Sequence, residues 1–173
     1  MCLCNVTWIS KNPTKNPKVP TKWTKGYKVF VTFETDWDSE QGKYVDKPVL
    51  CFPYNTPLSL KTKEDLELNK VYKAEKPYSK DEIQASDYKQ YPWGFHIFPA
   101  KMAGFRFGRD SKDNRFRLFL VEYRRVVAEG THNIHTSYDA DCVIAREMRI
   151  IRQLTEQEVM DLAADYEKVN SMK

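Results

Sequence analysis

Arginines recur on both sides of the polar segment 108–114, GRDSKDN, and they are the side chains in this sequence best suited to binding chemistry. If the flanking residues form the two arms of a hairpin, strand alternation places Arg106, Arg115 and Arg117 on one face. Guanidinium groups bind phosphates and carboxylates through paired N–H donors, and a nearby aromatic ring can stack on a base. The sequence therefore predicts an anion-binding surface made of Arg106, Arg109, Lys112, Arg115, Arg117 and Trp93.

The segment 99–107 also fits a second interpretation. Pro99 is suited to the first position of a short helix, which Gly104 would weaken by about 1 kcal/mol. We favour the hairpin, because Phe105, Phe107, Phe116 and Leu118 then share the apolar face. The choice between the two interpretations matters for function.

Cysteine and histidine give weaker signals. Removal of Met1 would leave Cys2 as an N-terminal nucleophile, but no partner set accompanies it. His132, His135 and Cys142 are spaced unlike the ligands of a structural zinc site. The glycine-rich and serine-centred templates of kinases, dehydrogenases and hydrolases do not occur. The sequence therefore predicts no metal, no cofactor and no assigned catalytic residue.

The elements that would position the arginines follow from local patterns. Residues 26–35 and 43–52 are rich in Val, Phe, Thr and Tyr and predict a β-hairpin, and 93–98, 118–123 and 142–151 predict further strands. Thr155 and Glu158 form a capping box before an amphipathic helix over 155–169. Residues 11–25 combine three prolines with five lysines and predict an extended arm.

Length and composition agree with one folded domain. The chain has 173 residues, 41% of them hydrophobic, and a formal net charge of +4. We expect an α+β fold: a mainly antiparallel, twisted sheet with the C-terminal helix on one face, an arm over 1–25 and a single domain over 26–173. We also expect a cytoplasmic protein with reduced thiols and no membrane partner, because the sequence has no long apolar run and no signal peptide.

Several short strings resemble one group of proteins. They are Met1-Cys2-Leu3, GYKVF (26–30), NKVYKAE (69–75), GFHIF (94–98), VVAEGT (126–131) and VIAREM (143–148). Together they are similar to a group of short, functionally uncharacterised proteins from bacteriophages and gut bacteria. The resemblance implies a phage or mobile-element accessory protein and supplies no reaction.

A fainter likeness concerns ADP-ribosyltransferase-type folds. Such enzymes place a basic or aromatic residue on an early strand, a polar residue after a central strand and a glutamate on a late strand. The likeness implies Lys28, His96 and Glu147 as the corresponding residues of this chain. None of the three lies in a recognisable family motif, so the implied catalysis is an analogy of fold.

We therefore expect a non-enzymatic accessory protein that binds through its basic surface, with counter-defence as a suitable role. Its partner would be an anionic nucleotide ligand or a host or phage protein; nucleic acid is less expected, because the net charge is modest and no reader motif occurs. One alternative is an ADP-ribosyltransferase-like enzyme. Another is a virion component, assembled or oligomerised through the arm.

Overall fold

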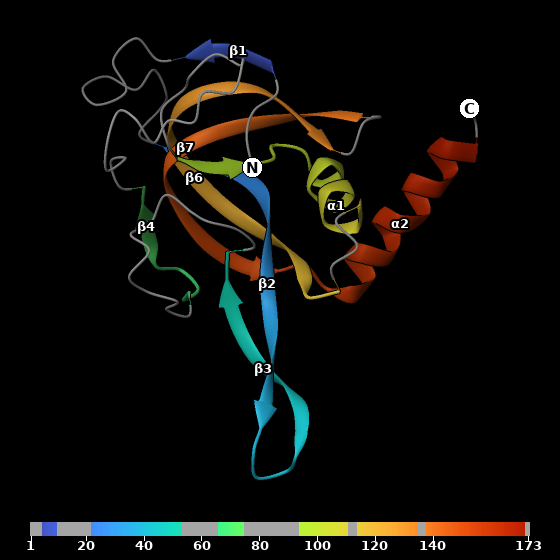
Figure 1. The fold of residues 1–173 in the computed structure, drawn as a ribbon. Coiled ribbons are helices and arrows are strands. Elements are labelled where there is room, and N and C mark those ends of the chain that lie inside the picture. Colours follow the sequence, from blue (N-terminus) through green and yellow to red (C-terminus); the bar gives the residue numbers. More distant parts are fainter. Residues whose placement is uncertain are drawn as a thin grey trace.

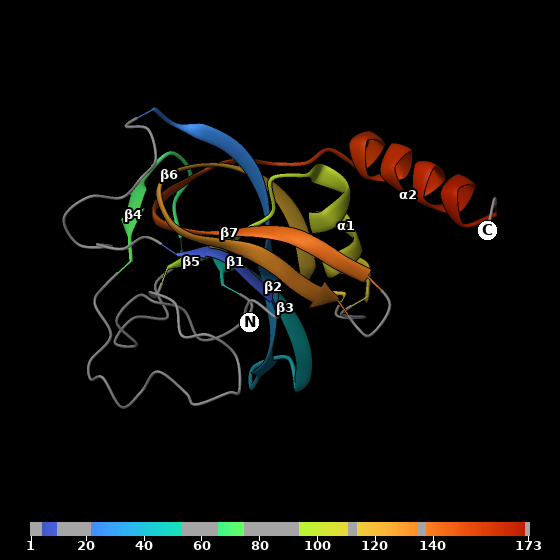
Figure 2. The same ribbon diagram turned by 90° about the horizontal axis from the view of Figure 1, so that it is seen from above.

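Long antiparallel strands dominate the computed structural model, which describes residues 5–9, 22–52, 66–74, 94–110, 114–134 and 138–171. Three strands carry most of the sheet: β2 (Thr24–Asp38), β6 (Phe116–Ile134) and β7 (Tyr138–Gln153). Their Val, Ile, Phe, Tyr and Thr residues favour extended backbone because branched and aromatic side chains pack well on a pleated surface. β6 and β7 curve strongly in Figure 1, and the curvature of β2 is seen in Figure 2.

The strands are ordered β3-β2-β6-β7-β4, with β1 paired to β6 and β5 paired to β7. The four shorter strands are β1 (Asn5–Ile9), β3 (Lys43–Cys51), β4 (Val71–Lys73) and β5 (Phe95–Ile97). The pairs among these described strands are antiparallel. The predicted hairpin over 26–35 and 43–52 is confirmed as β2 and β3, and a mainly antiparallel α+β domain is confirmed.

The sheet also closes on itself. Tyr27 and Phe98 exchange two backbone hydrogen bonds of 2.8 and 2.9 Å, which link β2 to the end of β5. The pairing therefore runs from β2 through β6, β7 and β5 back to β2. Gly26 permits this closure, because a Cβ at this position would lie 2.6 Å from Cγ2 of Ile97.

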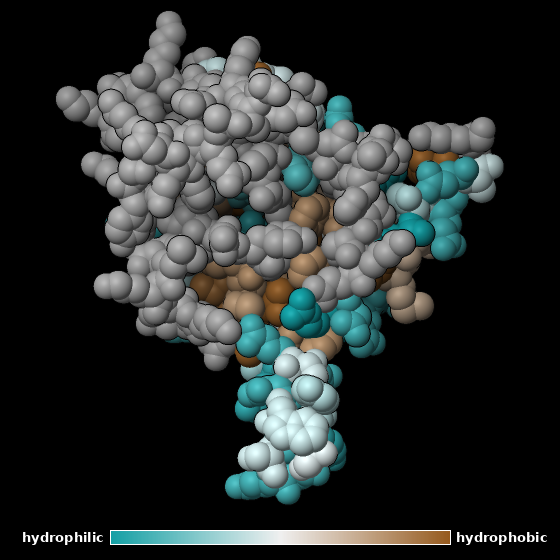
Figure 3. Space-filling view, viewed as in Figure 1, coloured by the Kyte–Doolittle hydropathy of each residue, from teal (hydrophilic) through white to brown (hydrophobic). Residues whose placement is uncertain are grey.

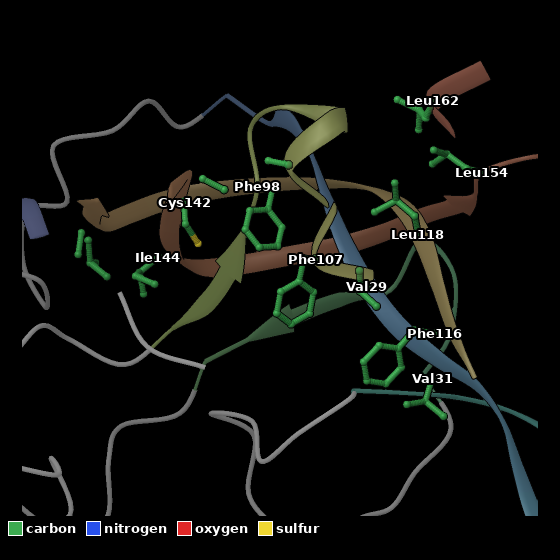
Figure 4. Close-up of a cluster of buried hydrophobic side chains, with 14 residues drawn as sticks. Val29, Val31, Phe98, Phe107, Phe116, Leu118, Cys142, Ile144, Leu154 and Leu162 are labelled. Carbon is green, nitrogen blue, oxygen red and sulfur yellow. The ribbon is translucent and has the colours of Figure 1, made fainter. Parts of the chain in front are cut away.

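Both faces of the sheet are buried. Val29 and Phe30, neighbours on β2, belong to two different apolar clusters, since successive strand residues point to opposite faces. Helices α1 (Lys101–Asp110) and α2 (Glu156–Ser171) cover the first cluster, to which they contribute Phe107 and Leu162. Figure 4 shows Phe107 close to Phe98 and Val29 in this cluster. The second cluster includes Leu66 and Ala74, and Phe52 packs against it.

The C-terminal helix is confirmed, and its capping box is formed. The Glu158 N–H donates to Thr155 Oγ1 at 3.2 Å, and the Thr155 N–H donates to Glu158 Oε2 at 2.9 Å. Leu162 is its buried residue, and the helix runs outward from the sheet towards its C-terminal end (Figure 2). No helix in the described ranges is long and apolar enough to span a bilayer.

The favoured hairpin over 105–118 is wrong, because residues 101–110 form α1. The helix buries Ala103 and Phe107, four residues apart, against the sheet. Gly104 faces the sheet so closely that a Cβ there would lie 2.8 Å from a Leu118 methyl carbon. This close approach explains why a glycine that weakens an isolated helix is tolerated here.

The N-terminal region departs in part from the predicted arm. Residues 5–9 form β1 and pair with β6, so this portion of the 1–25 segment belongs to the sheet. β2 begins at Thr24, just before the predicted boundary. Residues 10–21, which carry the prolines and most of the lysines, lie outside the described residues.

Candidate functional site

The arginines that the hairpin prediction grouped lie on two different elements. Arg106 and Arg109 are on α1, and both guanidinium groups lie over the ring of Tyr166 on α2, at 5.0 and 4.2 Å from its centre. Such cation–π contacts help to hold α2 against α1. These two arginines therefore have a structural role that the sequence did not indicate.

Arg115 directly precedes β6, and Arg117 is the second residue of this strand. The Arg117 guanidinium donates to the carbonyl oxygens of Asn114 and Phe116, at 2.6 and 2.9 Å. The Arg115 carbonyl accepts hydrogen bonds from the backbone and hydroxyl of Thr32. Lys112 and Trp93 lie outside the described residues. The predicted strand face is therefore not formed, and anion binding by these residues stays a prediction.

A second group of arginines lies where β6 pairs with β7. Both strands carry the pattern Glu-x-Arg, over 122–124 and 147–149, and the antiparallel register places Glu122 opposite Arg149 and Arg124 opposite Glu147. Arg124 Nε donates to Glu147 Oε2 at 2.6 Å, and Arg149 Nε donates to Glu122 Oε2 at 2.8 Å. Two neighbouring cross-strand ion pairs result.

Arg125 joins the same group through an unusual backbone. Its φ of 58° is in the left-handed region, which costs a residue with a Cβ free energy. Neighbouring strand residues normally point to opposite faces, yet here Arg124 and Arg125 both reach Glu147, with Arg125 Nε 3.3 Å from Glu147 Oε1. A register shift in β6 follows between Val126 and Ala128. The local distortion therefore directs two guanidinium groups to one carboxylate.

Trp23 completes the group, whereas Arg146 contacts the residue that follows β4. Arg146 Nη2 donates to the Ala74 carbonyl at 2.8 Å, and burial lowers the pKa of this arginine. The half-buried ring of Trp23, just before β2, lies 4.5 Å from the Arg124 guanidinium and 4.7 Å from that of Arg149. We call the set of residues joined by these contacts the arginine corner: Trp23, Glu122, Arg124, Arg125, Glu147 and Arg149.

The arginine corner presents positive charge outward. It holds three guanidinium groups and two carboxylates, a local excess of one positive charge. The side chains of Glu147 and Glu122 are only 6% and 19% exposed, whereas those of Arg124, Arg149 and Arg125 are 30%, 34% and 56% exposed. The carboxylates thus orient the guanidinium groups from within, and a dissolved anion meets the cations first.

Lys28 and His96 come together elsewhere, at the seam between β2 and β5. Lys28 is buried, and its Nζ donates to the His96 carbonyl at 2.9 Å. Burial lowers the pKa of Lys28 to about 8. Desolvation, and next the charge of Lys28, hold the pKa of His96 well below its usual value, so this imidazole is neutral at pH 7. The structure therefore brings together two of the three residues implied by the ADP-ribosyltransferase likeness.

Glu147, the third of those residues, belongs to the arginine corner. Lys28 is paired with Phe119 of β6, whereas Glu147 is paired with Arg124, five residues further along the same strand. Its carboxylate is occupied by two guanidinium groups. The three residues therefore do not share one set of contacts.

The remaining chemically notable side chains are packed into the core. Burial raises the pKa of Cys142 to about 12, so this thiol is protonated and donates to the Val143 carbonyl. The His132 ring lies against Phe98 and Phe107. Cys2 and His135 lie outside the described residues. Within the ranges that the structure describes, no three His, Cys, Asp or Glu side chains are placed to hold a metal ion.

The arginine corner was missed because its sequence signal is short. Each Glu-x-Arg triplet alone is typical of a solvated strand, and the adjacent pair Arg124 and Arg125 gives no direction by itself. The signal that could have revealed the corner is that the Glu-x-Arg triplet occurs twice, on two predicted strands that can pair in antiparallel fashion. Comparison of the chain with protein-family models, curated proteins and solved structures found no match, so the corner is interpreted from its own geometry.

Proposed function

We propose that this chain is a non-enzymatic binding protein of the phage or mobile-element accessory type, and that it binds an anionic nucleotide at the arginine corner. The observation that carries this proposal is the gathering of three guanidinium groups and an indole ring around only two, largely buried, carboxylates. Counter-defence, by sequestering a nucleotide that the host uses as a signal, suits such a protein.

The chemistry of the arginine corner supports a phosphate-bearing ligand. Guanidinium forks match phosphate oxygens in pairs, and an aromatic side chain beside them supports a base by stacking. Arg125 is the most exposed arginine of the corner, and its ion pair with Glu147, at 3.3 Å, is longer than that of Arg124, at 2.6 Å. We therefore expect Arg125 to contact the phosphate first while Arg124 and Arg149 stay in place.

Isothermal titration calorimetry with ATP, NAD and inorganic phosphate tests the proposal. Arg125→Gln should weaken the binding of the nucleotide about tenfold to a hundredfold, the effect of losing one charge-assisted hydrogen bond. Arg109→Gln on α1 is the matched control and should bind as the wild type does. The absence of binding for every nucleotide contradicts the proposal, and loss of binding in Arg109→Gln alone assigns the site to α1 instead.

An ADP-ribosyltransferase-like activity is the second candidate, favoured by the contact between Lys28 and His96 and by the low pKa of the Lys28 amine. It requires that purified protein consume NAD and that Glu147→Gln abolish this turnover. NAD that stays intact in the presence of folded wild-type protein excludes it. The virion alternative requires the protein in purified particles; residues 10–21 of the arm on which it depends lie outside the described residues.

A further inference from the structure

The far end of the β2–β3 hairpin is an acidic projection on an otherwise basic protein. We call residues 34–47 the acidic finger; they carry five carboxylates and two lysines, a net charge of −3. Because the whole chain carries +4, the rest of the chain carries +7. The finger extends well away from the body of the molecule, and its surface is hydrophilic (Figure 1, Figure 3).

Two aromatic side chains stand exposed on the acidic finger. Trp37 and Tyr44 are directly opposite each other, with ring centres 5.1 Å apart in an edge-to-face arrangement. Trp37 is 54% exposed and Tyr44 is 71% exposed, and they are the two aromatic residues among the exposed large hydrophobic residues that the structure describes. The pair stabilises the hairpin, and its outer surface is of the kind that forms the centre of protein interfaces.

The acidic finger is also well ordered by its own hydrogen bonds. Asp38 accepts from the backbone N–H groups of Glu40 and Gln41 in the turn, and Lys47 pairs with Asp36 at 2.8 Å. The Thr35 hydroxyl donates to Asp46 at 2.8 Å. A preordered loop loses little conformational entropy on docking, which favours binding through a small surface.

The acidic finger and the arginine corner lie at opposite ends of β2. Trp23 of the corner directly precedes the strand, and the finger occupies its far end. A strand of 15 residues spans up to about 50 Å, so the two surfaces of one molecule are too far apart to meet. Complementary charges at opposite ends of one strand favour contact between molecules.

We propose that a second copy of this chain occupies the arginine corner, with the acidic finger of one molecule docked on the corner of the next. Finger carboxylates would pair with the outward guanidinium groups, and Trp37 and Tyr44 would lie against the guanidinium face of Arg125. This inference rests on the proposed function in that the corner accepts anions. Because the two surfaces differ, the contact is head-to-tail and produces rings or open chains rather than a closed two-fold dimer.

Sedimentation velocity of the full chain at low and high salt tests the contact. The wild type should associate as its concentration rises at low salt, and high salt should dissociate it. Glu40→Lys inverts a charge in the finger without removing a side-chain hydrogen bond described there, and should weaken association. Glu167→Lys makes the same change on an exposed residue of α2 and is the matched control. A wild type that stays monomeric at low salt, or equal weakening by both variants, overturns the inference.

A mixing experiment tests the polarity. A finger variant, Trp37→Ala with Glu40→Lys, keeps its corner, and the corner variant Arg125→Glu keeps its finger. Each should be monomeric alone, whereas an equimolar mixture should form a one-to-one complex that cannot grow. A mixture that stays monomeric while the wild type associates overturns the head-to-tail assignment.

The two proposals fail separately. A monomeric wild type that binds ATP through Arg125 retains the proposed function and rejects the self-association. Association that depends on the finger, without binding of any nucleotide, rejects the nucleotide ligand and retains the contact. If both hold, ATP should dissociate the wild-type assembly, because the nucleotide and the finger compete for the same guanidinium groups.

Discussion

Lys28 places an ammonium group inside the sheet, and replacing it with methionine should remove a pH dependence of folding. Burial lowers the pKa of Lys28 from 10.5 to about 8, whereas the unfolded chain keeps the ordinary value. Between these two values the unfolded state binds more protons than the folded state. Wild-type stability attributable to Lys28 therefore rises with pH across this window, and the burial penalty is largest below pH 8.

The size of the effect follows from the two pKa values. A fall from 10.5 to about 8 corresponds to about 3 kcal/mol of destabilisation at neutral pH, at about 1.4 kcal/mol for each pH unit. Roughly 1 kcal/mol of this penalty remains at about pH 10, so the free energy of unfolding should rise by about 2 kcal/mol between about pH 7 and about pH 10. Solvent screening reduces it little, because Lys28 is only 6% exposed.

Urea denaturation of the wild type and of Lys28→Met at several pH values measures this rise. The difference between the two unfolding free energies should shift in favour of the wild type by about 2 kcal/mol as pH rises from neutral to about 10. Lys25→Met, at an exposed position of the same strand, should run parallel to the wild type. Parallel curves for Lys28→Met would refute the assignment of a buried, depressed amine.

Three further substitutions test the packing and the charges. Glu147→Gln should lower the free energy of unfolding, measured in urea, by about 2 kcal/mol, which is less than for a fully buried ion pair because the arginines are partly exposed. The control is Glu67→Gln, whose side chain is 65% exposed and which should change the free energy of unfolding by less than about 1 kcal/mol. Equal effects of the two substitutions would contradict the reasoning. Hydrogen bonds from Arg152 hold the pKa of Glu158 below its ordinary value of 4.5, so the stabilisation from this carboxylate is present above that pH and is lost in acid. The difference in melting temperature between the wild type and Glu158→Gln should therefore narrow as the pH is lowered. A difference that stays constant with pH would exclude this role. Gly26→Ala should lower the free energy of unfolding by about 1–3 kcal/mol, since the added Cβ would lie 2.6 Å from a side-chain carbon of Ile97. An unchanged melting temperature would show that β2 and β5 can move apart enough to accept the added methyl group.

Elements whose signals lie within a few residues were predictable. Thr155 and Glu158 identify the start of α2 because both partners of a capping box lie within one turn. The Val- and Phe-rich segments on either side of a polar turn identify β2 and β3 in the same way. In these cases the decisive contacts are local, so the order of the residues already contains them.

The segment 99–107 shows where local signals end. Its apolar residues satisfy a strand period and a helix period, and Gly104 argues against a helix in isolation. The helix forms because Ala103 and Phe107 pack onto the sheet, and because Gly104 allows α1 to approach Leu118 closely. The tertiary contact overrides the propensity, and the arginines expected on one strand face are separated as a result.

Residue order alone established the antiparallel α+β class, the β2–β3 hairpin and the helix after Thr155. Tertiary structure decided which charges meet. Glu122 and Glu147 find their arginines only because β6 and β7 pair in one register, and Arg125 reaches Glu147 only through a left-handed backbone. The physical reason is that ion pairing and burial depend on distances between residues remote in sequence, and the closed path of strands sets those distances.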